Sequence, residues 1–87
     1  MKVYDPDLIS PSTARLDAAL RAVGNEVLLA QHRFAPFASP HEAWAVIREE
    51  VDELWERVKA NDGRGTEARD EATQVAAMAV RYLLDVR

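Results

Sequence analysis

The chain has 87 residues, a formal net charge of −4 and no cysteine. A chain of this length forms one small domain, and the lack of cysteine excludes a disulfide framework or a thiolate metal site. The acidic balance argues against a nucleic-acid binder that neutralises phosphates. No apolar run reaches the ~18 residues that span a bilayer, and the N-terminus lacks a signal-peptide core, so we expect no membrane partner and a cytoplasmic location.

Residues 1–11 contain two prolines and no periodic pattern, so they predict an irregular arm ahead of a single domain at residues 12–87. Ser12 or Thr13 is the expected cap of a first helix. Its expected buried face consists of Leu16, Leu20, Val23, Val27, Ala30 and Phe34. Gly24 either marks a close helix approach or is simply tolerated in this helix. His32 and His41 are separated by a proline-containing loop and match no compact metal motif.

A second helix is predicted from Ser39 to Lys59. Ser39 is its cap, Pro40 suits its first turn, and Glu42 completes a capping box. The apolar residues of this helix recur at three- and four-residue steps, so the stripe they form should be buried. The stripe consists of Trp44, Ile47, Val51, Leu54 and Val58, with Trp55 at its edge.

Two carboxylates, Glu50 and Glu53, lie three residues apart along the border of this stripe. One interpretation is a solvated charged face with ordinary ion pairs, such as Glu49 or Glu53 with Arg57. The other interpretation is functional, because like charges beside an apolar seam repel each other and resist desolvation. The next helix favours this second interpretation.

That third helix is predicted from about Glu67 to Val86, with Thr66 as its cap. Glu71 shares a face with Val75, Met78 and Tyr82, and a carboxylate on an apolar stripe needs a partner. The turn signal before this helix is Asn61-Asp62-Gly63, which favours an antiparallel hairpin.

Facing positions of such a hairpin have residue numbers with a constant sum, and the pairs Glu53–Glu71 and Glu50–Gln74 both give 124. The centre of symmetry is then residue 62, inside the predicted turn. Three carboxylates and one amide oxygen should therefore converge at one level between the two helices. Oxygen ligands of this kind suit a hard divalent cation, Mg²⁺ or Mn²⁺.

The predicted fold class is all-α: an antiparallel helical hairpin plus an N-terminal helix. So short a chain cannot bury a large core alone, and the last helix spreads apolar side chains over several sides. We therefore expect a helix bundle that is completed by homo-oligomerisation, as a homodimer or homotetramer.

The acidic motifs resemble a known family. Glu49-Glu50-Val51-Asp52-Glu53, followed by Glu71-x-x-Gln74, is similar to the EExxE and ExxD pattern of the MazG-like all-α nucleoside triphosphate pyrophosphohydrolases. The likeness covers roughly residues 12 to 86. The tracts at residues 41–59 and 71–86 look especially similar to small MazG-like proteins of phages and prophages. The sequence departs from the pattern at Gln74, where the family has Asp.

The resemblance implies metal-dependent cleavage of an NTP or dNTP to the monophosphate and pyrophosphate. It assigns Mg²⁺ to Glu50, Glu53 and Glu71, with Gln74 at the fourth position, and it gives Glu49 a role in metal binding or in activating the attacking water. Candidates for the phosphate tail are Arg57, Lys59, Arg64 and Arg69. Because Gln74 removes a charge from the site, the alternative is a catalytically impaired helical module that binds nucleotide or a protein partner. A purely structural acidic bundle is the third hypothesis.

Overall fold

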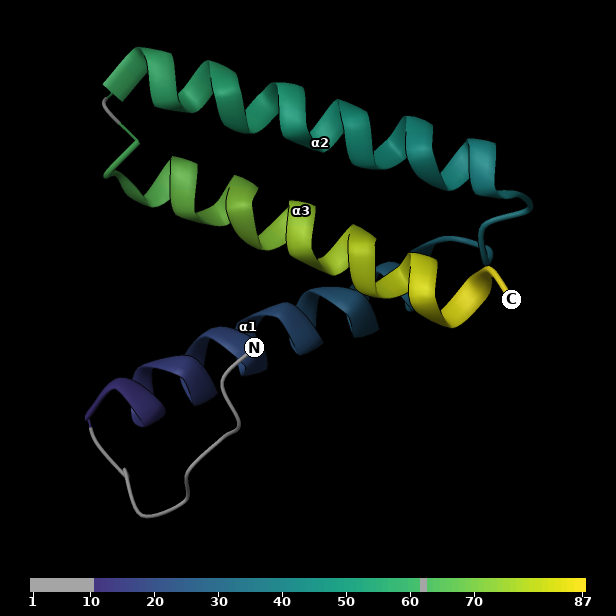
Figure 1. Cartoon of the computed structure of the whole chain (residues 1–87), viewed down its shortest axis with the longest axis horizontal. Helices are drawn as coiled ribbons and strands as arrows, with labels where there is room; N and C mark the ends of the chain where they lie inside the picture. The colour runs from purple at the N-terminus through teal and green to yellow at the C-terminus, as the bar shows by residue number, and fades with distance from the viewer. Residues whose placement is uncertain (1–10, 62) are drawn as a thin grey trace, which may run out of the picture.

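Three helices, with no strand among the described residues, make up the computed structural model of the chain, which describes residues 11–61 and 63–87. They are α1 (Pro11–Arg33), α2 (Pro40–Asn61) and α3 (Thr66–Asp85). Helices α2 and α3 run side by side in opposite directions, and α1 packs across α3 (Figure 1). The all-α fold and the helical hairpin are thus confirmed. The predicted arm at residues 1–11, except Pro11, and the symmetry centre at residue 62 lie outside the described residues.

The helix ends agree with the sequence to within about two residues, but two of the predicted caps are wrong. Helix α1 begins at Pro11, so Ser12 and Thr13 lie inside it; proline suits a first helical turn because its missing N–H needs no partner there. Helix α3 begins at Thr66. Its N-cap is Gly65, which has an extended backbone and no side chain that could cap the helix. Thr66 is therefore the first helical residue and not the cap.

The start of α2 is capped as the sequence predicts, with one difference. The Glu42 backbone N–H donates to Ser39 Oγ at 3.1 Å, which is the first half of the capping box. The Glu42 carboxylate accepts from the backbone N–H of Ala38 at 3.2 Å, one residue before the cap itself. The carboxylate thus fixes the linker that leads into α2.

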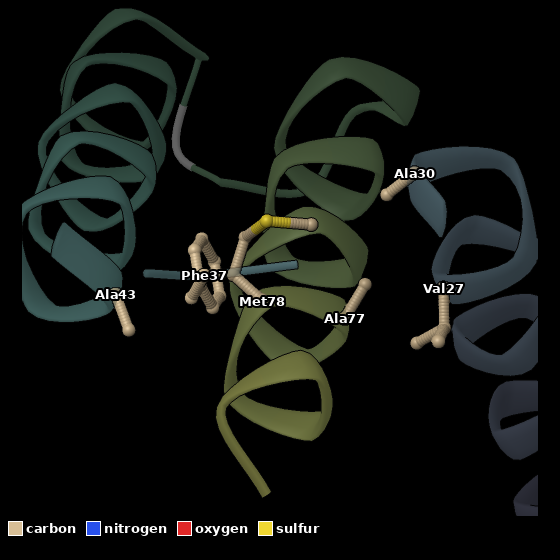
Figure 2. Close-up of a cluster of buried hydrophobic side chains, with 6 residues drawn as sticks. All are labelled: Val27, Ala30, Phe37, Ala43, Ala77 and Met78. Atoms are coloured by element: carbon tan, nitrogen blue, oxygen red, sulfur yellow. The ribbon is translucent and has the colours of Figure 1, made fainter. Parts of the chain in front are cut away.

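The hydrophobic core is small and lies where the linker between α1 and α2 meets α3. Figure 2 shows Val27 beside Ala77 of α3, while Met78 and Phe37 lie between α3 and α2. The buried apolar residues of this cluster are Val27, Ala30, Phe37, Ala43, Ala77 and Met78. Because one side chain from the linker belongs to this core, the linker helps to hold the three helices together.

Half of the predicted apolar stripe on α2 is exposed, and the prediction that the whole stripe is buried is wrong for this chain. Trp44 is 60% exposed, and Val51 and Trp55 are also exposed. The face that packs is rotated instead, and it runs through Ala43, Ile47, Glu50, Leu54 and Val58. Because α3 is the only one of the described helices that α2 contacts, one side of its stripe has no helix beside it. Glu50 consequently lies on the packed face and not at its border.

The predicted face of α1 is likewise buried only in part. Val27 and Ala30 are buried, but Leu16, Leu20 and Phe34 are exposed. For Leu16 and Leu20 the reason is visible in Figure 1, where the N-terminal half of α1 extends away from the hairpin. Apolar side chains on that half therefore find no partner within the described residues.

Two glycines behave differently, which leads to a first prediction. Gly63 follows α2 with a left-handed φ of 74°, and an added Cβ would lie 3.2 Å from Val58 Cγ2. Gly24 is helical and exposed, and an added Cβ would meet nothing within 4 Å, so this glycine is tolerated and not required. We expect Gly63→Ala to lower the free energy of unfolding by about 1 kcal/mol and Gly24→Ala to raise it by about as much. Chemical denaturation of both variants measures this, and equal effects would contradict the assignment.

Candidate metal centre

The hairpin brings Glu50, Glu53 and Glu71 together. Each offers one carboxylate oxygen, and these three oxygens all lie within 4.8 Å of one another. Glu50 and Glu53 occupy successive turns of α2, and Glu71 faces them from α3. The convergence of Glu53 and Glu71 predicted from the constant residue sum is therefore confirmed. We call these three residues the carboxylate cluster.

The cluster is electrostatically unfavourable without a cation. Desolvation, followed by the charges of Glu53 and Glu71, raises the pKa of Glu50 to about 7. Desolvation and the Glu53 charge also raise the pKa of Glu71, while Arg57 acts in the opposite direction. Within the described part of the chain, no hydrogen-bond partner reaches the buried Oε2 of Glu71. A bound divalent cation would relieve both the repulsion and this missing partner, so the donor set fits a hard metal ion.

Gln74 and Glu50 line the same cavity, but the amide of Gln74 is engaged with another residue. Gln74 Nε2 donates a hydrogen bond of 2.7 Å to Glu26 Oε2 on α1. The role of Gln74 as a metal ligand stays a prediction. Glu26 was missed in the sequence, although the necessary signal was present. It directly precedes Val27 at the edge of the buried face of α1, where a carboxylate needs a partner, as Glu71 does.

Glu49 lies outside the carboxylate cluster and is exposed. Neighbouring residues of an α-helix point about 100° apart, so Glu49 cannot share the direction of Glu50. Its role with the attacking water stays a prediction. The exposed position keeps its carboxylate in contact with solvent.

The basic residues differ in their distance from the cluster. Arg57 lines a hollow together with Glu53, Glu56 and Glu71, and it forms an ion pair of 3.2 Å with Glu67 of α3. That contact replaces the predicted pairing of Arg57 with Glu49 or Glu53. Arg57 is therefore the phosphate-tail candidate that the fold brings to the cluster.

The other three candidates for the phosphate tail do not line the hollow that contains Glu53 and Glu71. Lys59 contacts Glu56 at 2.8 Å and lies over the ring of Trp55, 5.6 Å from its centroid. Arg64 is exposed in the turn between α2 and α3. Arg69 lines a separate hollow between α1 and α3. Their assignment to phosphate stays a prediction.

A cavity of about 350 Å³ adjoins the cluster through Glu50. Its walls come from all three helices and from the linker between α1 and α2. They are Glu26, Leu29, Ala30, Arg33, Phe34, Ala35, Phe37, Glu42, Val46, Glu50, Gln74, Met78 and Arg81. We call it the central cavity. Its volume lies at the lower end of the range of about 300–1,000 Å³ that is usual for small-molecule sites.

Comparisons with known proteins add no further constraint on this site. Neither the profiles of known families, nor the curated proteins, nor the solved structures match the chain. Over the described residues, no helix combines the length and the apolar character needed to cross a bilayer. The acidic motifs and the geometry of the cluster and its cavity are therefore the basis for inferring the function.

Proposed function

We propose that the protein is a metal-dependent nucleoside triphosphate pyrophosphohydrolase, which cleaves an NTP or dNTP between the α- and β-phosphates. The observation that carries the proposal is the convergence of Glu50, Glu53 and Glu71 from two helices, with a buried oxygen of Glu71 that no group in the described chain satisfies. The MazG-like pattern of the same residues points to the same chemistry. A ligand-sized cavity beside Glu50 supports it further.

In this proposal the three clustered carboxylates hold Mg²⁺ or Mn²⁺. The ion, when bound, neutralises charge on the triphosphate and lowers the pKa of a coordinated water. Glu49, whose side chain points away from Glu50, would accept the proton of the attacking water through intervening solvent as that water adds in line to the α-phosphorus and pyrophosphate leaves. Arg57 helps to orient the phosphate tail from the neighbouring turn.

Glu50 makes this metal binding sensitive to pH. A carboxylate must be deprotonated to bind a cation, and the pKa of Glu50 is about 7 in the protein without metal. A proton and the metal ion therefore compete for the same side chain. We expect the apparent metal affinity to fall as the pH drops below about 7.

The second candidate function is a helical module that binds nucleotide or a protein partner and has lost turnover. Gln74 favours it, because its amide nitrogen donates to Glu26 and the side chain carries no charge for a cation. The two positions are coupled: an Asp at position 74 would place a carboxylate beside that of Glu26. Restoring the family pattern at position 74 alone would therefore create a new repulsion.

The proposal includes a second copy of the chain. Ten large apolar side chains are exposed among the described residues, and a monomer rarely leaves so many uncovered. They are Leu16, Leu20, Leu28, Leu29, Phe34, Trp44, Val51, Trp55, Leu83 and Leu84. A homodimer or homotetramer would cover most of them, and a cytoplasmic location, where nucleotide pools are found, completes the proposal.

The testing experiment is a panel of NTPs and dNTPs assayed for pyrophosphate and monophosphate with Mg²⁺ and with Mn²⁺. We expect metal-dependent release from some member of the panel. Glu53→Gln and Glu71→Gln should each lower the rate by about 100-fold, because each removes a metal ligand. Asp52→Asn is the matched control, since Asp52 is an exposed acid of α2 that pairs with Arg48 and should leave the rate unchanged.

Nucleotide binding and the melting temperature, measured together with this assay, separate the three hypotheses. Nucleotide that binds in the presence of Mg²⁺ without yielding monophosphate supports the impaired module. If neither metal raises the melting temperature, the result favours the purely structural bundle, because a ligand that binds only the folded state must stabilise it.

A further inference from the structure

The kinds of side chain that line the central cavity change along its length. Glu26, Glu50 and Gln74 line the end that adjoins the carboxylate cluster. The wall residue that follows Gln74 on α3 is Met78, and α1 and α2 contribute Ala30 and Val46. Arg81 lies further along α3, roughly 10 Å from Gln74 at the helical rise. Beyond the end lined by Glu26, Glu50 and Gln74, most of the lining residues are apolar, and the charged ones are Arg33, Glu42 and Arg81.

This order matches the order of parts in a nucleotide. Phosphates bind at a metal centre, a sugar carries hydroxyl groups that donate hydrogen bonds, and a base is a flat ring with a large apolar face. Starting from the carboxylate cluster, the chain provides acids, then the Glu26–Gln74 pair, then the apolar walls with the rings of Phe34 and Phe37. The level of the Glu26–Gln74 pair thus corresponds to the sugar.

The hydrogen bond between Gln74 and Glu26 leaves one oxygen of the Glu26 carboxylate able to contact a ligand. Gln74 Nε2 donates to Oε2 of Glu26 at 2.7 Å, which holds the carboxylate in place from the neighbouring helix. A carboxylate accepts several hydrogen bonds and donates none, so Oε1 of Glu26 can accept another. A sugar hydroxyl is a donor that suits it.

We propose that the central cavity binds the nucleoside half of the substrate and that Glu26 accepts a hydrogen bond from a hydroxyl of the sugar. This assignment rests on the proposed function for the identity of the ligand. It makes Glu26 a specificity-determining residue. Gln74 then has a role as the group that positions Glu26, which accounts for an amide where the resembling family has Asp.

The test uses the full chain in EDTA, so that neither metal binding nor turnover contributes. Adenosine, guanosine, cytidine and uridine are titrated while the NMR signals of Met78 and Phe37 are followed. We expect saturable shifts with at least one of them. For that base, either the 2′-deoxy or the 3′-deoxy nucleoside should bind about tenfold more weakly than the ribonucleoside, as expected for a lost hydrogen bond to a charged acceptor.

The variants isolate Glu26. Glu26→Ala should remove the tenfold difference between the nucleosides, while Asp17→Ala, which removes an exposed acid from the same helix, should retain it. Glu26→Gln keeps an acceptor for Gln74 and replaces the Ala variant if that variant loses its helical circular dichroism signal. Equal weakening of all three nucleosides by Glu26→Ala would show that the residue acts only structurally.

The outcomes also separate this inference from the proposed function. No saturable shift with any of the four nucleosides overturns the cavity assignment, even if pyrophosphate is released in the nucleotide assay. Saturable binding at Met78 and Phe37 without any pyrophosphate release supports the cavity assignment and overturns the enzymatic proposal. Equal binding of the ribonucleoside and both deoxynucleosides overturns the role of Glu26.

Discussion

Glu50→Gln is expected to stabilise the metal-free protein by about 2 kcal/mol near pH 8 and by less than about 1 kcal/mol near pH 5. In the folded chain, the pKa of Glu50 is raised from 4.5 to about 7 by desolvation and by the neighbouring carboxylates. The native state therefore holds its proton more tightly than the unfolded state. The associated stability is fully present below pH 4.5 and is lost as the pH rises through about 7. A neutral Gln avoids that loss.

Measurement by chemical denaturation in EDTA at both pH values tests this, with Asp52→Asn as the control. Asp52 is an exposed acid of the same helix, so its replacement should change stability little at either pH. A gain for Glu50→Gln that is the same near pH 5 and near pH 8 would show that charge repulsion is not its cause.

A divalent cation should reverse the order of stability of the wild-type protein and the Glu50→Gln variant. Near pH 8 the wild-type chain has three carboxylates within reach of one ion, so Mg²⁺ or Mn²⁺ should raise its melting temperature. Glu50→Gln removes one of the three and should lose most of that increase. With both results, the wild-type cluster would be costly without a cation and stabilised by one, as expected of residues that serve binding and not folding.

The position of the cluster could be predicted from the sequence because it depends on local rules. Helical periodicity sets which residues share a face, and the turn at Gly63 sets which positions of α2 and α3 oppose each other. These two rules are sufficient to bring Glu53 and Glu71 together. They do not depend on how the third helix is placed.

The features that the sequence did not predict depend on that placement. Helical periodicity places Trp44 and Val51 on one apolar stripe of α2. Which side of that stripe lacks a neighbouring helix depends on the position of α1, which packs across α3. The same packing couples Glu26 to Gln74 across 48 positions of the chain. It also buries Arg81, which composition alone would assign to the surface.

Arg81 leads to the second large expected effect. Its side chain is almost fully buried, and its guanidinium donates to the backbone oxygen of Ala35 at 3.0 Å. The same group lies 4.2 Å from the centroid of the Phe37 ring and 3.9 Å from Asp85 Oδ2. Asp85 Oδ2 in turn accepts from the Phe37 backbone N–H at 3.0 Å. Two side chains of α3 thereby hold the linker that connects α1 to α2.

Arg81→Ala is expected to lower the free energy of unfolding by about 3–5 kcal/mol, because it leaves the buried Asp85 carboxylate without its cation. Arg48→Ala is the matched control: its ion pair with Asp52 is exposed, so its loss should cost less than about 1 kcal/mol.

The double variant Arg81→Met with Asp85→Asn keeps an acceptor for the Phe37 N–H and removes the unpaired charge, so it should recover part of the loss. Denaturation curves of the three variants measure this, and no recovery in the double variant would show that the unpaired Asp85 charge is not the cause of the loss. Since Arg81 and Phe37 also line the central cavity, the contacts that hold the linker in place help to fix the shape of that part of the cavity.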